Sequence, residues 1–461
     1  MTTETTSDAD NPKQAARLAS QTRAIVQAIS HCLATIDDDK PLDRVLAAYS
    51  RAHRELGSRD RRAIGAMCFA SLRWWGWIEP FVPDIRETAL SRTEALPDDD
   101  QAWPRLLLML SGLERRELSP LVASWLDAVD LAETTFAAWT GLDDMCERYA
   151  AICAAMGLSG AVTTGLSALL PTWAAAALAP HVSVEQVAAW TVRRPPLWLR
   201  LMPDRQDTAR DALDAAGLDA RRHDRIATAV SVGQPRVNLA ALPAYCDGSI
   251  ENQDLASQCV GHICAPKPDE QWWDACCGGG GKALHLAALA GPHGRITATD
   301  QRDTVLKNLR SRAKRSSVHH IRTQACDITV RAPAFAFHGV LVDAPCSGSG
   351  RWRRAPDRMW VPARTSLEAH AARQRALLDA AAHHVLPGGV LVYATCSLFH
   401  AENEDVVEAF LGDHPAFAPD AFEHPLTGAT TPGMLTIYPW DGDCNGMFIA
   451  RLRRQPSAES S

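Results

Sequence analysis

The sequence lacks a transmembrane run, a secretory signal and the cysteine pairs of a clustered zinc site. Its richest apolar stretch, SGAVTTGLSALLPTWAAAALAP, is interrupted by Thr, Ser and Pro before it reaches transmembrane length. The first segment, MTTETTSDADNPKQ, is polar and acidic, unlike a secretory signal. The cysteines number thirteen, an odd count, and none forms a Cys-x-x-Cys pair, which argues against a disulfide framework. We therefore predict a cytoplasmic protein with no metal site and no membrane partner.

The sequence also lacks an excess of positive charge. Lys and Arg number 47 against 54 Asp and Glu, a formal net charge of −7, so any contact with nucleic acid must come from local basic patches. A chain of 461 residues is too long for one typical core, so two or three domains are expected. Nothing in the sequence indicates self-association, and a monomer is the default expectation.

The pattern of apolar residues changes along the chain. Residues 15–168 repeat apolar positions at helical spacing, as in Ile25, Ile29 and Leu33, and predict an all-helical domain. Residues 169–245 predict a small α+β linker region, with a helix in DRQDTARDALDAAGLD and a strand in SVGQPRVNLAALPAY. Residues 1–14 and 455–461 are predicted to be disordered.

Short apolar runs alternate with helical stretches over residues 246–454. Examples are EQWWDAC, KALHLAALA, GRITATD and FHGVLVDAP. This alternation predicts an α/β fold with a doubly wound, mostly parallel, Rossmann-like sheet. Only a turn-rich link separates GMLTIYP from GMFIARLRR, and these two runs suit an antiparallel pair at one edge.

A glycine-rich turn follows the first strand of this predicted sheet. The turn comprises Cys276, Cys277, Gly278, Gly279, Gly280, Gly281 and Lys282. It is not a phosphate-binding P-loop, because Ala283 follows the lysine. Three aspartates, Asp300, Asp327 and Asp343, end or follow the next strands, as expected for a crevice that binds an adenosine-containing cofactor. The alternative is that each aspartate only caps the helix after it.

Two cysteines, Cys346 and Cys396, also follow strand ends, and they would face the same crevice. One such cysteine is usually a packed core residue, but a pair beside an adenosine pocket favours chemistry. Methylation of a pyrimidine at C5 needs such groups. A thiolate that adds to C6 makes C5 nucleophilic, and a base then removes the C5 proton so that the thiol leaves.

These motifs resemble a known family. DACCGGGGK, ATD, DAPCSGSGRWRRAPDRMW and YATCS with AENEDVV are similar to the successive motifs of the Sun/Nop (also called Fmu) family of S-adenosylmethionine-dependent RNA cytosine-5 methyltransferases. LGSRDRRAIGAMCFASLRW resembles the antitermination-factor-like RNA-binding domain that its bacterial 16S ribosomal RNA members carry. The resemblance spans most of the chain, although 88–156 matches little.

The resemblance implies a role for each candidate residue. Cys396 would be the nucleophile, Cys346 the helper in product release, and Asp343 would lie by the cytosine and the cofactor. The turn from Cys276 to Lys282, with Asp300 and Asp327, would hold S-adenosylmethionine. The chain departs from the family at Gly278 and Gly279, where Ala-Pro is usual, and at Val305, where Arg is frequent.

Basic residues beside the helper cysteine are the candidate RNA contacts. Arg351, Arg353 and Arg354 would hold phosphates near the reacting base. A second run (Lys307, Arg310, Arg312, Lys314 and Arg315) is expected to be a solvated helix face. Small-subunit ribosomal RNA is the expected substrate. Transfer RNA, a non-catalytic RNA-binding assembly factor and a nucleotide-dependent oxidoreductase are the alternatives.

Overall fold

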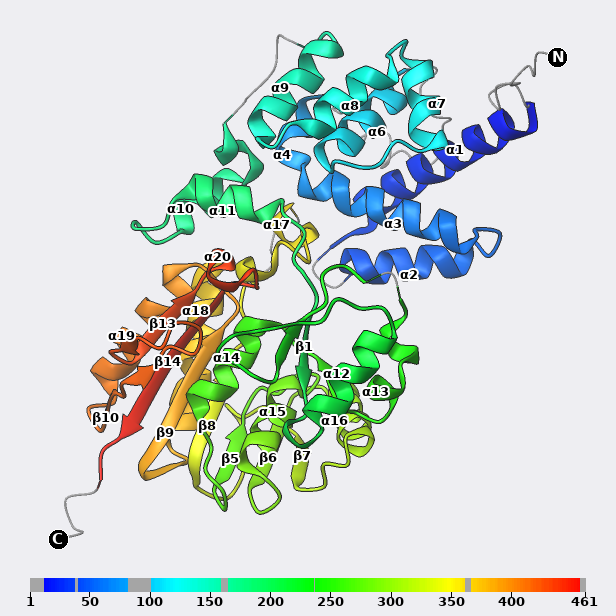
Figure 1. Ribbon diagram of the computed structural model, residues 1–461. Helices are drawn as coiled ribbons and strands as arrows, with labels where there is room; N and C mark the ends of the chain where they lie inside the picture. Colours follow the sequence, from blue (N-terminus) through cyan, green and yellow to red (C-terminus); the bar gives the residue numbers. More distant parts are fainter. Residues whose placement is uncertain are drawn as a thin grey trace. The chain divides into compact units, whose positions relative to one another are not determined.

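The computed structural model describes residues 12–37, 40–81, 101–158, 165–235, 237–360 and 366–456. The chain divides into two compact units (Figure 1). The helical unit comprises 1–176, 180–193 and 355–364, and the α/β unit comprises 177–179, 194–354 and 365–461. Of the tails predicted to be disordered, 1–11 and 457–461 lie outside the described residues. Pro12 begins the first helix, so that prediction is wrong for residues 12–14.

The helical unit contains only helices in its described residues. Its α-helices are α1 (Pro12–Thr35), α2 (Leu42–Ala52), α3 (Ser58–Arg73), α4 (Trp75–Ile78), α6 (Ala102–Leu113), α7 (Pro120–Ala128), α8 (Glu133–Gly141), α9 (Met145–Ala155), α10 (Thr172–Ala177) and α11 (Val184–Thr191), with α17 (Asp357–Trp360) from later in the chain. Two 3₁₀ turns, Glu79–Phe81 and Leu166–Leu169, lie between them. The all-helical prediction is confirmed in kind, but the unit continues past residue 168 to 193. None of the helices in the described ranges combines the length and apolarity needed to cross a bilayer.

The segment 355–364 belongs to the helical unit although its neighbours in sequence belong to the α/β unit. The Trp360 indole donates to the Leu72 carbonyl at 2.7 Å, and Asp357 accepts from the Leu42 main-chain N–H at 3.2 Å. These bonds fix α17 against α2 and α3. No local pattern in the sequence indicated this insertion.

The α/β unit begins with a four-stranded antiparallel sheet of order β2-β3-β1-β4. Its elements are β1 (Trp198–Leu201), α12 (Gln206–Ala215), β2 (Arg221–Arg222), β3 (Ala229–Ser231), α13 (Pro243–Cys246) and β4 (Ile250–Asn252). The predicted helix is α12. The predicted strand over 231–245 is wrong, because β3 ends at Ser231 and Pro243 begins α13, a position that proline favours.

The large sheet has the order β10-β14-β9-β8-β5-β6-β7, with β13 also paired to β14 (Figure 1). Its strands are β5 (Gln271–Asp274), β6 (Arg295–Asp300), β7 (Ile321–Ala325), β8 (Phe337–Asp343), β9 (Val385–Thr395), β10 (Phe417–Pro419), β13 (Met434–Ile437) and β14 (Met447–Arg454). The first five pair in parallel, and β13 and β14 pair antiparallel, which confirms both predictions. Since β5 lies between β6 and β8, the strand order reverses there, and ligands bind at such a point.

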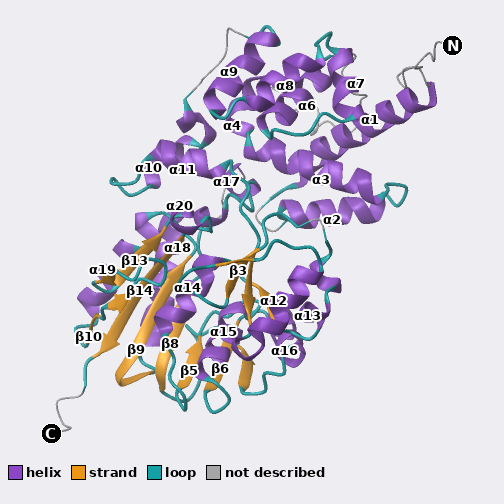
Figure 2. Cartoon of the chain, in the orientation of Figure 1, coloured by secondary structure: helices purple, strands orange, loops and turns teal. Residues whose placement is uncertain are grey.

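Helices cover both faces of this sheet, as predicted (Figure 2). One core contains α14 (Leu255–Cys264), α15 (Gly281–Ala290) and α16 (Asp303–Arg315), and the other contains α18 (Leu367–Ala382) and α19 (Glu404–Asp413). Alternate strand residues enter alternate cores: Trp272 and Leu341 face α14–α16, whereas Trp273 and Val342 face α18 and α19. The alternation leaves the strand ends free to carry polar groups.

Candidate active site

A cavity of about 610 Å³ opens at the carboxyl ends of β5, β8 and β9. Such a volume is typical of a site for a small molecule or cofactor. Its walls come from the glycine turn, from the ends of β8 and β9, and from the segment that joins β4 to α14. The lining side chains include Lys282, Asp343, Arg351, Cys396, Asn252 and Asn445.

The two predicted cysteines lie together beside this cavity. The Sγ atoms of Cys346 and Cys396 are 3.3 Å apart, and both thiols are free. The hydrogen bond from Cys346 lowers the pKa of Cys396, against its burial, and the charges of Arg351 and Lys282 act in the same direction. The same hydrogen bond, with burial, raises the pKa of Cys346 well above its ordinary value. The neighbouring cations Arg351 and Lys282 thus favour Cys396, rather than Cys346, as the acceptor of the hydrogen bond between the two sulfurs.

An ion pair lies next to the thiols. The Lys282 ammonium donates to the Asp343 carboxylate at 2.8 Å, and the lysine side chain is only 11% exposed. Burial alone would lower the pKa of Lys282, but the charge and hydrogen bond of Asp343 raise it above its ordinary value. The lysine therefore remains a cation beside Cys396.

The glycine turn is held from two sides. Gly278 has φ +51° and donates its N–H to Asp300 at 3.1 Å. Gly280 has φ +82°, and a Cβ there would meet Leu309 of α16 at 2.3 Å. The left-handed backbone at Gly278 explains why glycine stands there in place of the alanine that is usual in the family. The turn presents Cys277, Gly278, Gly279, Gly281 and Lys282 to the cavity.

Two of the predicted cofactor residues point elsewhere. Cys276 packs against the core on the α18 face of the sheet, and burial raises its pKa far above the ordinary range. Asp327 accepts from Thr329, both main chain and hydroxyl, and from the Gln301 amide, as a residue that caps a turn does. The capping alternative therefore fits Asp327. The Asp300 carboxylate accepts from the Arg302 guanidinium as well. Burial raises the pKa of Asp300, but its hydrogen bonds from Arg302 and Gly278 outweigh burial and hold that pKa below the ordinary value.

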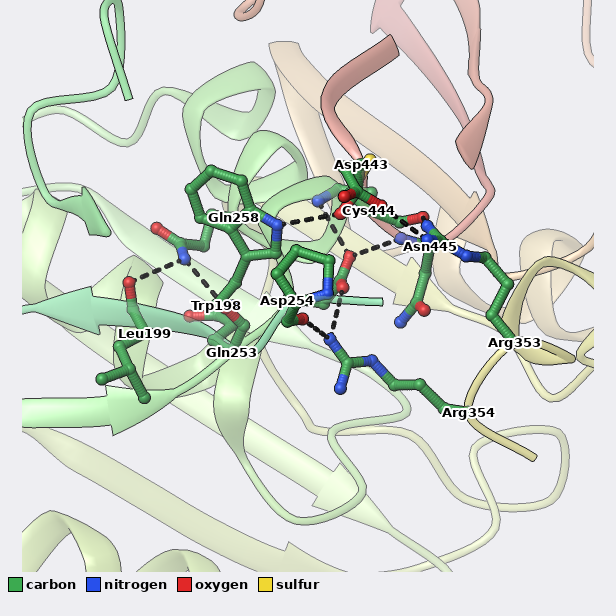
Figure 3. A network of polar contacts seen from close by, with 12 residues as sticks. Trp198, Leu199, Gln253, Asp254, Gln258, Arg353, Arg354, Asp443, Cys444 and Asn445 are labelled. Atoms are coloured by element: carbon green, nitrogen blue, oxygen red, sulfur yellow. Dashed lines mark hydrogen bonds and ion pairs between the residues drawn. The ribbon is translucent and has the colours of Figure 1, made fainter. Parts of the chain in front are cut away.

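Of the three arginines predicted to contact phosphates, one is exposed and two are hydrogen-bonded to other protein groups. Arg351 is exposed and lines the cavity. Arg353 is 3% exposed and donates to Asp443 at 2.5 Å and to the Cys444 carbonyl at 3.1 Å. Arg354 donates to the Pro196 carbonyl at 2.6 Å and lies 3.4 Å from Asp254 (Figure 3). The prediction that Arg353 holds a phosphate is wrong, because its buried guanidinium is already hydrogen-bonded to Asp443 and Cys444.

Figure 3 shows the segments that these arginines join. Asp254 caps α14 and also accepts from the Asn445 main-chain N–H at 3.0 Å, while the Trp198 indole donates to the Asp443 carbonyl. Three segments far apart in sequence thus meet at one rim of the cavity. The Asn445 side chain lines the cavity, and its buried Oδ1 accepts no hydrogen bond from the residues described.

The second basic run is only partly the expected solvated face. Lys307 and Arg310 pair with Asp303 at the surface. Arg312 and Arg315 instead pair with Glu251, which is 2% exposed, and Arg312 also donates to the Gly279 carbonyl at 2.6 Å. The prediction is wrong for these two residues, because a buried carboxylate from β4 needs cationic partners.

Sequence reasoning did not single out Asp274 and Glu402. Asp274 ends β5 with no exposed surface, and neither of its carboxyl oxygens accepts a well-formed hydrogen bond in the described part of the chain. Burial, with the charge of Asp343, raises the pKa of Asp274 to about 8. Its position at the end of the first apolar strand was the available signal. Glu402 lies in AENEDVV, where an acidic residue reads as an ordinary helix start.

Comparison with known proteins agrees with this geometry. Residues 262–453 match the family model described as 16S rRNA methyltransferase RsmB/F. The probable ribosomal RNA small subunit methyltransferase B of Synechocystis sp. is 33% identical over 285 residues, which cover 59% of this chain and 63% of the relative. The protein of that name from Bacillus subtilis is 32% identical over 253 residues, 53% of this chain and 56% of the relative.

A solved structure extends the likeness of the fold. The crystal structure of PH0851 superposes with a TM-score of 0.71 and 23% identity, covering 94% of this chain and 98% of that one. The sequence matches, by contrast, span less than two thirds of the length of these curated relatives. Residues 262–453 are therefore similar to the methyltransferase domain of the RsmB/F family.

Proposed function

We propose that the protein transfers a methyl group from S-adenosylmethionine to C5 of a cytosine in RNA, through a covalent bond between Cys396 and C6. The observation that carries this proposal is the pair of free thiols 3.3 Å apart, next to the Lys282–Asp343 ion pair and the glycine turn. An oxidoreductase that only transfers hydride to a nicotinamide on a similar sheet would not need this pair.

The cavity fits the cofactor. Glycines without Cβ atoms let the main chain approach a ligand closely, and Gly278 has no atom within 4 Å of the position of a Cβ. Asp300 ends β6, where a carboxylate accepts from ribose hydroxyls in folds of this kind. S-adenosylmethionine, when bound, supplies an electrophilic methyl group.

The side chains of the chain perform the remaining steps. The Cys396 thiolate forms a bond to C6, which pushes electrons onto C5 for attack on that methyl group. Asp343, held by Lys282, is the group that would hydrogen-bond the ring as it gains electrons. Cys346 assists release: when the C5 proton is lost to a base, the bond between sulfur and C6 breaks and the Cys396 thiolate is restored.

Small-subunit ribosomal RNA is the proposed substrate, since the relatives carry that substrate in their names. Arg351 is the proposed contact to the RNA near the reacting base. The base must leave its stack to meet Cys396, so a loop or bulge is expected rather than a regular duplex. A cytoplasmic monomer is proposed as well, and thirteen free cysteines fit a reducing compartment.

The test is a map of 5-methylcytosine at single-nucleotide resolution in total RNA from cells with and without the gene. Wild-type, Cys396→Ala and Cys346→Ala versions are returned to the deletion strain. We expect one modified site to disappear on deletion and to return only with the wild type. We also expect Cys346→Ala to leave a covalent protein–RNA adduct, because the first bond forms but release fails.

An unchanged map at every cytosine, with the protein expressed, would refute the proposal and favour a non-catalytic RNA-binding factor. A lost site in transfer RNA would retain the chemistry and replace the substrate.

A further inference from the structure

A single buried carboxylate joins the two loops that carry the thiols. Glu402 ends the 3₁₀ turn His400–Glu402 after β9, and the residue has no exposed surface. Its Oε1 accepts from the Ser347 main-chain N–H at 2.8 Å and from the Gln374 amide at 3.1 Å. Its Oε2 accepts from the hydroxyls of Ser347 and Ser397, each at 2.5 Å. One carboxylate thus receives four donors from three separate segments.

The two serines are equivalent in position. Ser347 directly follows Cys346, and Ser397 directly follows Cys396. Their hydroxyls reach the same oxygen atom and lie 3.3 Å from each other, the same separation as the two sulfurs. Because Ser347 and Ser397 bind the same carboxylate oxygen of Glu402, this contact also fixes the distance between the two thiols.

The main chain around Glu402 is also fixed. The Tyr393 hydroxyl donates to the Glu402 carbonyl, and the Gln374 amide that reaches Oε1 also donates to the Pro345 carbonyl at 3.0 Å. A buried carboxylate is costly unless it is fully hydrogen-bonded. No ion pair to Glu402 occurs in the described ranges, so its four hydrogen-bond donors alone offset the cost of burying the carboxylate.

We propose that Glu402 is a positioning residue that holds the sulfurs of Cys346 and Cys396 at their working separation. The reaction that it serves rests on the proposed function, whereas the geometry that it maintains does not. Without Glu402, the two loops lose their common acceptor, and Cys346 no longer donates steadily to the Cys396 thiolate.

The first measurement is the rate at which iodoacetamide alkylates Cys396 in the full-length protein as a function of pH, followed by peptide mass spectrometry. The charged groups that face Cys396 are Asp343 at the end of β8, Lys282 on α15 and Arg351 in the 3₁₀ turn Ser349–Arg351. Glu402→Gln keeps all three. We expect this variant to move the alkylation profile of Cys396 to higher pH by roughly one unit, the size of losing one hydrogen bond to a thiolate.

The sign separates positioning from a simple charge effect. Removal of a negative charge beside the thiols would favour thiolates and move the profile to lower pH. Cys346→Ala, which removes the donor outright, should move it upward like Glu402→Gln. The matched control is Asp420→Asn, which breaks a half-buried pair with Arg451 and Arg453 near the opposite end of β9 and should keep the wild-type profile.

The second measurement uses RNA and S-adenosylmethionine. Glu402→Gln should lower kcat about tenfold with little change in KM, because it alters the chemical steps rather than binding. A wild-type alkylation profile in folded Glu402→Gln protein would overturn the inference. If that variant does not fold, Ser347→Ala and Ser397→Ala each remove one donor and should show smaller upward shifts, and no shift in either would overturn it. An upward shift in a protein that methylates no RNA would retain the inference and reject the proposed function.

Discussion

At the scale of single residues, the site differentiates groups that are chemically alike. Cys346 and Cys396 are two thiols in contact, yet the pKa of one is raised and that of the other is lowered, because one donates the hydrogen bond that the other accepts. Asp343 and Asp274 differ in their partners. Asp343 has Lys282 as partner, whereas Asp274 has burial without a cation within hydrogen-bond distance in the described part of the chain. The surroundings of each group, rather than its residue type, therefore distinguish the two thiols and the two carboxyl groups.

The buried carboxyl of Asp274 should make the stability of the protein depend on pH. Its folded pKa of about 8 lies above the ordinary value of 3.8, so this group contributes most below pH 3.8 and loses its contribution as pH rises to about 8. Within that window the free energy of unfolding falls by up to about 1.4 kcal/mol per pH unit from this group. We therefore expect Asp274→Asn to lose less stability than the wild type between pH 5 and pH 8, measured by urea unfolding.

The comparison needs an exposed carboxylate as control. Asp219 is 75% exposed at its side chain and pairs with Arg221 at the surface, so Asp219→Asn should follow the wild-type slope. Parallel slopes for the wild type and Asp274→Asn would mean that Asp274 is ionised throughout this range.

At the scale of elements, Arg312 connects three pieces of the cofactor wall. From α16 it reaches the Gly279 carbonyl of the glycine turn and the Glu251 carboxylate of β4. Lysine has one donor group and cannot span both partners. We expect Arg312→Lys to weaken binding of S-adenosylhomocysteine about tenfold, measured by calorimetry, because the turn loses its tie to α16.

The neighbouring Arg310 on the same helix offers the matched control. It pairs with Asp303 and Thr323 at the exposed face, away from the turn. Arg310→Lys should retain the affinity of the wild type. Equal losses in both variants would assign the effect to the helix as a whole rather than to the bond with Gly279.

At the scale of the whole molecule, the sequence predicted the features that depend on local pattern. Alternating runs located β5 to β9, and because parallel strands end at one edge, Asp343, Cys346 and Cys396 were expected to meet, as they do. The partners of Arg353 lie 90 and 91 residues away, and those of Arg312 lie 33 and 61 residues away, so no local pattern distinguishes these engaged arginines from free ones. The insertion of 355–364 into the helical unit was hidden for the same reason.

The division into two units predicts where the cofactor acts. All residues that line the cavity belong to the α/β unit, so a bound cofactor should stabilise that unit by mass action and leave the helical unit unchanged. At about one hundred times its dissociation constant, S-adenosylhomocysteine should add about 2.7 kcal/mol to the unfolding free energy of the α/β unit. Hydrogen exchange followed by mass spectrometry should show slower exchange in the glycine turn and in α15, with exchange in α1 and α3 unaltered. Equal protection of both units would contradict this, because it would mean that they open together as one cooperative body.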